Sequence, residues 1–305
     1  MLGQLLLAAS RSRLVRRSVS GFPLTRKVVD RFVAGESAAE ARDAIERLVD
    51  AGLTVTVDHL GEEVRDARAA AGTAHAYVEL LEALRPLELG TRGEVSVKLS
   101  AVGQALDDGM ALEHARQICE AAALNGSTVT LDMEDHTTVD STLEILRKLR
   151  EDFPSTGVAI QAYLFRSEQD CRDLALEGSR VRLVKGAYRE PASVAHQGKG
   201  EVDKAYVRCL RILMAGKGYP MVATHDDRLI SITELLADRF GRTVGDYEYQ
   251  MLYGIRTDRQ EALAGAGHTV RVYVPYGDDW YGYFMRRLAE RPANVAFFLR
   301  ALGGK

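Results

Sequence analysis

Cysteine is scarce in this chain. Its 305 residues include only Cys119, Cys171 and Cys209, and an odd number cannot form a complete set of disulfide pairs. Each cysteine lies in a helical pattern, so we expect three buried, reduced thiols. Thiols of this kind are typical of cytosolic proteins and favour a cytoplasmic location.

An excess of charge of one sign is lacking as well. The chain has 43 acidic and 40 basic residues, a net charge of −3, and its basic residues are dispersed. The charge distribution therefore gives no case for nucleic-acid binding. No apolar run approaches the ~20 residues that a transmembrane helix needs. A hydrophobic content of 46% is ordinary for a globular protein with a full core.

Several sequence motifs of nucleotide and metal sites are missing. There is no GxxxxGK[ST] sequence, and neither HxH nor HExxH occurs. The run Gly265-Ala266-Gly267 precedes a predicted strand, whereas a dinucleotide-binding turn follows one. These absences argue against a P-loop enzyme, a Rossmann-type site and a zinc protease, and we predict no metal site.

What the chain does have is a regular alternation of strand-like and helix-like segments. Eight short, apolar runs are typical of buried parallel strands, namely Thr54–Val57, Val95–Leu99, Thr128–Met133, Val158–Tyr163, Val181–Lys185, Met221–Thr224, Asp246–Met251 and Thr269–Val274. Helical patterns lie between them, at Met110–Leu124, Val139–Glu151, Glu168–Leu176, Asp203–Met214, Arg228–Phe240 and Asp258–Ala264.

Eight such units without a Pro- or Gly-rich linker favour one closed (βα)8 TIM-like barrel, which typically needs about 250 residues. A doubly wound open sheet is the alternative. We expect a single domain over residues 1–305, with a helical extension at 1–50, the barrel at 51–295 and a tail at 296–305. The last helix of the barrel is expected to be distorted.

The first 31 residues are rich in basic side chains. They contain six arginines and Lys27 but only one acid, Asp30. This composition fits a mitochondrial transit peptide, an amphipathic helix on anionic lipid, or a helix packed on the domain. We favour the last. The alternatives would place the protein in a mitochondrion or at the inner face of a membrane.

Polar side chains follow nearly every predicted strand, which is where a barrel enzyme carries its catalytic groups. They are Asp58, His59 and Glu62 after the first strand, Lys98 and Asp132 on the second and third, Gln161 and Tyr163 on the fourth, Arg182 and Lys185 on the fifth, Thr224 and His225 on the sixth, Gln250 on the seventh and Tyr273 on the eighth.

One of these polar groups needs a charged partner. Lys98 lies between Val97 and Leu99, so its ammonium should be buried, and a buried cation needs a carboxylate such as Asp132 on the next strand. This pair is either structural or functional. Arg182 and Lys185 differ in strand parity, so both can face the barrel interior only if Lys185 lies beyond the strand end.

The most informative segment is the helix predicted at residues 281–294, after the last strand. Tyr283, Arg286, Arg287 and Glu290 fall at i, i+3, i+4 and i+7, on one face. Two neighbouring guanidiniums can bind a carboxylate by paired hydrogen bonds. The alternative is a solvated helix face with an Arg286–Glu290 ion pair. The residues thus favour a barrel enzyme that acts on a small carboxylate.

Four motifs together resemble the proline dehydrogenase family, flavin enzymes with a distorted (βα)8 barrel. They are Ser96-Val97-Lys98-Leu99-Ser100, Arg182-Leu183-Val184-Lys185-Gly186-Ala187-Tyr188, Ala223-Thr224-His225, and Tyr283-Phe284-Met285-Arg286-Arg287 with Glu290. The resemblance implies oxidation of L-proline to Δ1-pyrroline-5-carboxylate, with hydride passing from C5 to N5 of FAD and electrons onward to a membrane quinone.

The resemblance also implies roles for individual residues. Arg286, Arg287 and Lys98 would bind the proline carboxylate, Asp132 would support Lys98, and Glu62 would pair with Arg286 over the closed site. Tyr273, Tyr283 and Leu252 would pack against the proline ring. The residues implied to bind FAD are Gln161, Arg182, Lys185, Gly186, Ala187, Tyr188, Thr224, His225, Gln250 and Glu290.

The chain departs from the family pattern at Arg189, where many relatives carry Trp. We expect no fused aldehyde dehydrogenase domain, so a separate pyrroline-5-carboxylate dehydrogenase is the expected functional partner. Two other functions stay open: a Schiff-base lyase that uses Lys98 or Lys185 as its nucleophile, and an inactive barrel that only binds.

Overall fold

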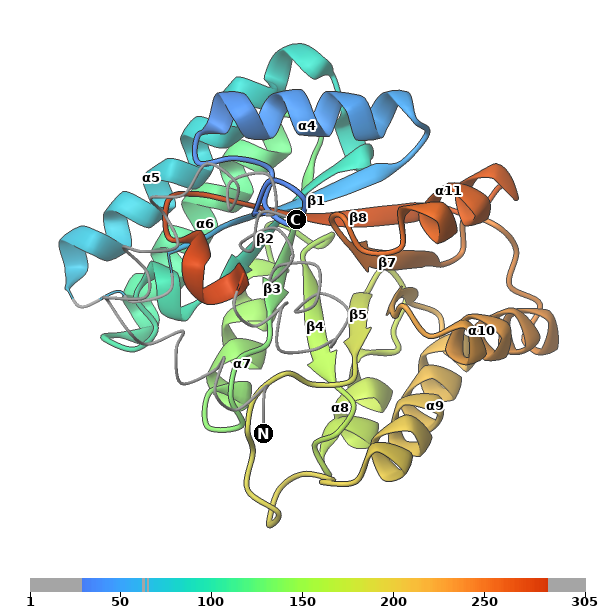
Figure 1. Ribbon diagram of the computed structural model, residues 1–305. Coiled ribbons are helices and arrows are strands. Elements are labelled where there is room, and N and C mark those ends of the chain that lie inside the picture. Colours follow the sequence, from blue (N-terminus) through green and yellow to red (C-terminus); the bar gives the residue numbers. More distant parts are fainter. Residues whose placement is uncertain (1–28, 62–63, 65, 285–305) are drawn as a thin grey trace, which may run out of the picture.

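The computed structural model describes residues 29–61, 64 and 66–284, and eight parallel strands close there into a barrel (Figure 1). The strands are β1 (Thr54–His59), β2 (Gly93–Lys98), β3 (Thr128–Asp132), β4 (Gly157–Gln161), β5 (Arg180–Val184), β6 (Tyr219–Ala223), β7 (Glu248–Leu252) and β8 (Val270–Tyr276). Each strand pairs with the next in sequence, and β8 pairs with β1. The predicted barrel is confirmed, and the open sheet is excluded.

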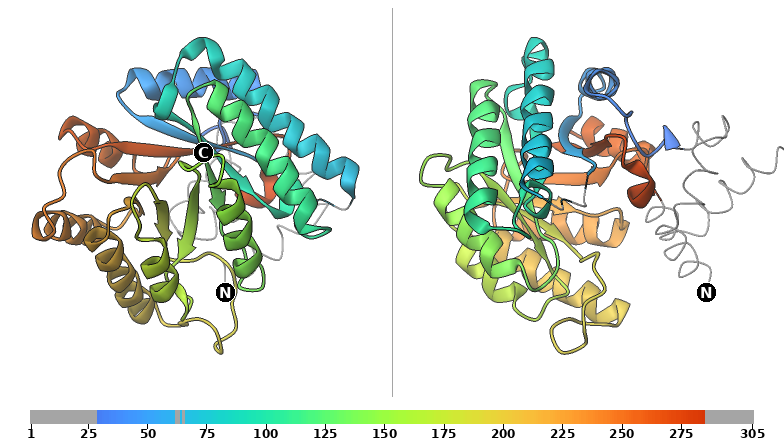
Figure 2. Two further views of the ribbon diagram at one scale, coloured as in Figure 1. Left: turned by 180° about the vertical axis from the view of Figure 1, so that it is seen from behind. Right: turned by 90° about the vertical axis from the view of Figure 1, so that its left-hand side faces the viewer.

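Helices form the outer layer around the strands, as the two views in Figure 2 show. The helices are α4 (Ala38–Asp50), α5 (Ala67–Leu84), α6 (Asp108–Leu124), α7 (Val139–Leu149), α8 (Ser167–Leu174), α9 (Lys199–Ala215), α10 (Asp227–Arg239) and α11 (Thr257–Gly265). Short 3-10 turns follow at η1 (Arg85–Leu87), η2 (Gly90–Arg92) and η3 (Ser100–Val102). None of the described helices is long and apolar enough to cross a bilayer.

The predicted helices from α6 to α11 are confirmed to within a few residues, whereas α5 was not among them. Its Ala-rich sequence gives a strong helix propensity but only a weak apolar stripe. The helix is nevertheless well anchored, because Asp66 caps its first turn and Tyr77 is fully buried against β1 and β2.

The two faces of each strand have different environments. On β2, Val95 and Val97 join the apolar core between the strands and the helices. The alternating residues Glu94, Ser96 and Lys98 face the barrel interior, where they contact side chains from other strands. The barrel therefore has an apolar outer core and a polar interior. Cys119, Cys171 and Cys209 are buried free thiols on the helices, as predicted.

Residues from both ends of the described chain meet beside the ends of β1 and β8. The indole of Trp280 donates a hydrogen bond to Glu36 at 3.0 Å, and the rings of Phe32 and Phe284 lie 6.2 Å apart. Residues 280–284 are helical, as predicted for the start of the last helix. The rest of that helix, with Arg286, Arg287 and Glu290, lies outside the described residues, as do Glu62 and residues 1–28.

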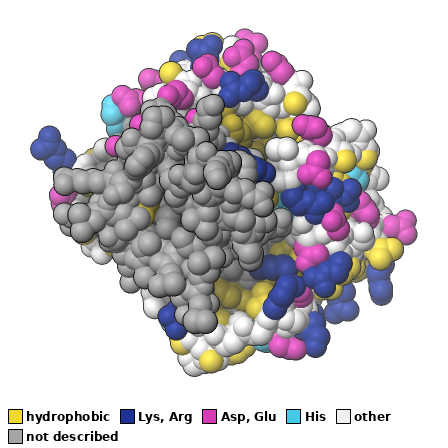
Figure 3. All heavy atoms as spheres, viewed as in Figure 1, with side chains coloured by type: hydrophobic (Ala, Val, Ile, Leu, Met, Phe, Trp, Pro, Cys, Tyr) yellow, Lys and Arg dark blue, Asp and Glu magenta, His cyan; other side chains and the backbone are white. Residues whose placement is uncertain are grey.

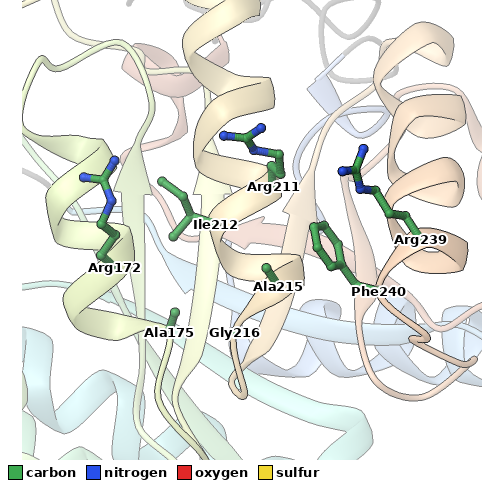
Figure 4. Close-up of a pocket in the computed structure, with 8 residues that line it drawn as sticks. All are labelled: Arg172, Ala175, Arg211, Ile212, Ala215, Gly216, Arg239 and Phe240. Carbon is green, nitrogen blue, oxygen red and sulfur yellow. The ribbon is translucent and has the colours of Figure 1, made fainter.

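Acidic and basic side chains are interspersed over the outer helices on the face shown in Figure 3. This distribution agrees with the small net charge of −3. A shallow hollow of about 450 Å³ lies outside the barrel, lined by residues of α8, α9, α10 and their ends (Figure 4). Its lining includes Arg172, Arg211 and Arg239 but none of the predicted site residues. The candidate site is therefore inside the barrel.

Candidate functional site inside the barrel

Eight charged side chains from six strands contact one another inside the barrel. The cations are Lys98, Arg180, Arg182 and Arg271, and the carboxylates are Asp58, Glu94, Asp132 and Glu248. Four cations and four carboxylates balance to zero. A closed, neutral set of this kind avoids the large cost of an unpaired buried charge.

Lys98 lies at the carboxyl end of β2 between two carboxylates. Its Nζ donates to Asp58 at 2.8 and 2.7 Å and lies 3.7 Å from Asp132. The sequence predicted Asp132 as the partner of Lys98, and the structure adds Asp58 as the closer one. Burial raises the pKa of Asp58 above its ordinary value, and the charge of Lys98 opposes the shift.

Asp132 is the acceptor on which three donors converge. One of its oxygens accepts from Ser96 at 2.7 Å and Arg182 at 2.6 Å, and the other accepts from Tyr273 at 2.8 Å. Burial acts against ionisation of Asp132, but the charges of Arg182 and Lys98 outweigh it and lower the pKa. Burial also raises the pKa of Tyr273 well above its ordinary value, so its phenol stays protonated.

Arg182 was grouped with the polar side chains that follow the predicted strands, but it does not follow its strand. It lies in the middle of β5 and is only 3% exposed. Both ends of its guanidinium donate to carboxylates, through Nη1 to Asp132 at 2.6 Å and through Nη2 to Glu94 at 2.8 Å.

The remaining donors of Arg182 also have partners. Nε donates to Gln250 at 2.6 Å, Nη1 also donates to Ser96 at 2.6 Å, and Nη2 also donates to Thr56 at 3.3 Å. Burial acts against the charge of Arg182, but Asp132 and Glu94 outweigh it and raise its pKa. All three nitrogens are thus held inside the barrel.

At the rim, the loop after β5 is fixed to β4. The amide oxygen of Gln161 accepts from the N–H of Ala187 at 3.2 Å, and its nitrogen donates to the carbonyl of Glu134 at 2.6 Å. The Tyr163 hydroxyl accepts from the N–H of Tyr188 and donates to its carbonyl, both at 3.2 Å. These contacts bring Gln161, Ala187 and Tyr188 together, as predicted.

Gly186 allows this close approach of the loop to β4. Its φ of +125° lies in the region that favours glycine, and a Cβ there would fall 2.4 Å from the ring of Tyr163. No other residue fits without moving that ring.

Lys185 lies just beyond β5, as its strand parity predicted. Its Nζ contacts Asp203 at 2.5 Å and Asp226 at 3.6 Å. Next to it, the Thr224 hydroxyl accepts from the N–H of Asp226 at 3.1 Å. These residues form a polar group at the rim between β5 and β6.

His225 links β6 to β7. Its Nε2 accepts from the N–H of Leu252 at 3.0 Å, so this nitrogen carries no proton when the contact is made. Leu252 pairs in register with Tyr273 on β8, which places both at the mouth of the barrel. Tyr283 is buried beyond them in the helical residues 280–284.

Sequence reasoning missed the charged groups deeper in the barrel, above all Glu94, Glu248 and Arg271. The available signal was strand parity, because Glu94 lies two and four residues before Ser96 and Lys98 on one face of β2. A carboxylate on the same face as a buried lysine is a candidate for the same interior network.

Comparisons with known proteins show the family of this chain. The family model for proline dehydrogenase matches residues 41–300. The chain is 38% identical over 302 residues to proline dehydrogenase 1 of Bacillus subtilis, covering 99% of both chains. It is 41% identical over 280 residues to the proline dehydrogenase of Deinococcus radiodurans, covering 90% of both.

A solved structure shares the fold. Proline utilization A from Bdellovibrio bacteriovorus, inactivated by N-propargylglycine, matches with a TM-score of 0.80 and 26% identity. The match covers 87% of this chain and 33% of the solved chain, so this chain spans about a third of that larger protein.

Proposed function

This chain belongs to the proline dehydrogenase family, and we propose that it oxidises L-proline to Δ1-pyrroline-5-carboxylate with FAD, in the first step of proline catabolism. When bound, FAD would accept the hydride that leaves C5 of proline. The observation that carries the proposal is the polar mouth of the barrel, where Lys98, Asp132 and Tyr273 converge.

The residues at the rim fit a flat group with polar edges. The β5 loop packs on the ring of Tyr163 at Gly186 so closely that a Cβ there would overlap the ring. Around it lie amide, hydroxyl, imidazole and ammonium groups, which suit the ring carbonyls and phosphates of a dinucleotide. The side chains that would hold FAD are Gln161, Arg182, Lys185, Thr224, His225 and Gln250, with backbone groups of residues 186–188.

Lys98 is the described cation best placed to bind the proline carboxylate. Its side chain is 13% exposed, so it reaches the mouth while two carboxylates fix its position. A fixed ammonium orients a carboxylate substrate without the entropy cost of ordering a mobile lysine. In this proposal Arg286 and Arg287 complete the carboxylate site, and Leu252, Tyr273 and Tyr283 pack against the ring.

We further propose that electrons pass from the reduced flavin to a membrane quinone. A relative from Escherichia coli is named as a bifunctional protein, and this chain matches 26% of its length at 29% identity. We also propose a pyrroline-5-carboxylate dehydrogenase as the functional partner, because the proposed product is the substrate of such an enzyme.

The structure disfavours a Schiff-base lyase at Lys98. A nucleophilic lysine needs a free lone pair, whereas the Lys98 ammonium donates to both oxygens of Asp58. Lys185 is likewise paired with Asp203 and Asp226. Borohydride added with a small keto acid should therefore leave Lys98 and Lys185 unmodified.

The decisive experiment is the visible spectrum of the purified protein. We expect flavin absorbance that bleaches when L-proline is added without oxygen. In Lys98→Met the flavin should remain bound, but bleaching should need more proline. A protein that takes up no flavin, or whose flavin proline does not reduce, contradicts the proposal.

A further inference from the structure

Arg182 contacts the buried carboxylate of Glu94 deeper in the barrel. We propose that Glu94 is a positioning residue for proline oxidation, because it fixes the guanidinium of Arg182 beneath the mouth of the barrel. This inference rests on the proposed function, in which Arg182 contributes to the flavin site. It concerns a residue that the sequence did not single out.

Glu94 is itself braced by a second arginine. Its Oε1 accepts from Arg182 at 2.8 Å, and its Oε2 accepts from Arg180 at 2.7 Å. The carboxylate is completely buried, and Thr128 donates to it at 3.4 Å. Because both of its oxygens are bound, the Glu94 carboxylate has a fixed position and holds the Arg182 guanidinium in place.

The second acceptor below Arg182 is braced in the same way. Gln250 accepts from Nε at 2.6 Å, and its own nitrogen donates to Glu248 at 2.6 Å. Glu248 in turn accepts from Arg271 at 2.8 and 3.1 Å. Arg182 therefore rests on two acceptors, each tied to another arginine of the barrel interior.

Without Glu94, the guanidinium would keep only one carboxylate, Asp132. Arginine has a long side chain with large rotamer freedom, so a lost anchor allows it to shift toward the remaining charge. Asp132 also binds Lys98 and Tyr273, so a displaced Arg182 would disturb the groups proposed to bind proline. Glu94 thus holds one end of the Arg182 guanidinium in the barrel interior, while Asp132 holds the other end nearer the mouth.

Two substitutions separate the geometry from the charge of Glu94. Glu94→Asp keeps the charge but is one methylene shorter, so it cannot reach Arg180 and Arg182 together. Glu94→Gln keeps the length but removes the charge. The comparison variant is Glu248→Asp, an equal shortening of a buried carboxylate that reaches Arg182 only through Gln250.

We expect Glu94→Asp to slow flavin reduction at saturating proline by about ten- to a hundred-fold, because small misplacements in a site are costly. The Kd for proline should change much less. Glu248→Asp, which acts on Arg182 only through Gln250, should slow flavin reduction by a clearly smaller factor than Glu94→Asp. In Glu94→Gln the flavin potential should become more positive, since a buried negative charge is lost. A merely structural role for Glu94 would not move that potential.

A double mutant tests whether Glu94 acts through Arg182. In an Arg182→Lys background, Glu94→Asp should cause little further slowing, whereas additive effects would overturn the inference. Equal slowing in Glu94→Asp and Glu248→Asp, or wild-type rates in Glu94→Asp, would also overturn it. So would a failure of both Glu94 variants to fold, which would make the residue structural. If wild-type protein is not reduced by proline, the proposed function itself fails.

Discussion

Asp58 holds Lys98 with both of its carboxylate oxygens, at 2.7 and 2.8 Å from Nζ, and is itself only 1% exposed. The two residues lie on neighbouring strands β1 and β2, where Asp58 pairs in register with Ser96. A buried carboxylate in this position fixes the direction of the ammonium before any substrate arrives.

The first prediction concerns this pair. Asp58→Asn should raise the KM for proline and lower the free energy of unfolding. Removing one partner of a buried ion pair typically costs about 3–5 kcal/mol, and Asp132 at 3.7 Å offsets part of the loss. Steady-state kinetics and urea unfolding measure the two effects.

Asp132→Asn is the matched control for Asp58→Asn. Asp132 accepts hydrogen bonds from Arg182 and Tyr273. Its replacement should therefore affect the rate of flavin reduction more than the KM for proline. If the two variants have the same KM and the same rate, the separate roles assigned to the two carboxylates are wrong.

The sequence predicted the barrel because eight short strand-like runs strictly alternate with helices, although the structure shows that the interior faces of the strands are polar. It could not predict the partners of Arg182, because Glu94 lies on β2, on the other side of the barrel from β5. That contact depends on closure and on the stagger between strands, and the β3–β4 pairing spans only Thr130 and Leu131 on β3. Strand parity alone does not fix this stagger.

The rim residues were easier to predict than the interior. Gln161 ends β4, and Lys185 and His225 lie within two residues of the ends of β5 and β6. The carboxyl ends of parallel strands meet at one rim. The strand bounds were less accurate, since β7 runs over Glu248–Leu252 whereas the sequence predicted Asp246–Met251. The roles of the rim residues in binding FAD and proline stay predictions.

The second prediction concerns the stability that Arg182 contributes. Arg182→Met should destabilise the protein by about 3–5 kcal/mol, because it leaves Glu94 and Asp132 with less compensation inside the barrel. Lys185→Met is the control, since the Lys185 side chain is 31% exposed and its loss should cost much less. Urea midpoints compare the two, and equal midpoints would show that the interior network does not depend on Arg182.

The third prediction concerns pH. Burial acts against ionisation of Glu94, but the charges of Arg180, Arg271 and Arg182 outweigh it and lower its pKa below the ordinary 4.5. As the pH falls, the Glu94 carboxylate therefore takes up a proton in the unfolded chain at a higher pH than in the folded protein. The stability contributed by Glu94 is fully present above pH 4.5 and is lost as the pH falls below it.

Glu94→Gln tests the sign of this effect. The variant should be less stable than the wild type at neutral pH, and the difference should shrink as the pH falls below 4.5. Because the other carboxylates are common to both proteins, their titration cancels in the comparison. Urea unfolding over a range of pH provides the measurement, and a difference that stays constant would mean that Glu94 has an ordinary pKa.

The last prediction concerns the close contact at Gly186. Gly186→Ala places a Cβ 2.4 Å from the ring of Tyr163, on a backbone with φ of +125° that alanine adopts only with strain. Either the ring or the loop must move, and the hydrogen bonds between Tyr163 and Tyr188 should break. We expect weaker flavin binding, seen as a lower flavin content after purification.

Gly178→Ala separates the effect of backbone strain from the effect of the clash with the Tyr163 ring. Gly178 also has a positive φ, of +76°, but a Cβ there meets nothing within 4 Å. It should therefore show the backbone strain alone, with a modest loss of stability and a normal flavin content. Gly186→Ala combined with Tyr163→Leu relieves the ring clash and should recover part of the flavin. If Gly186→Ala retains full flavin, the contact between the β5 loop and Tyr163 is not part of the cofactor site.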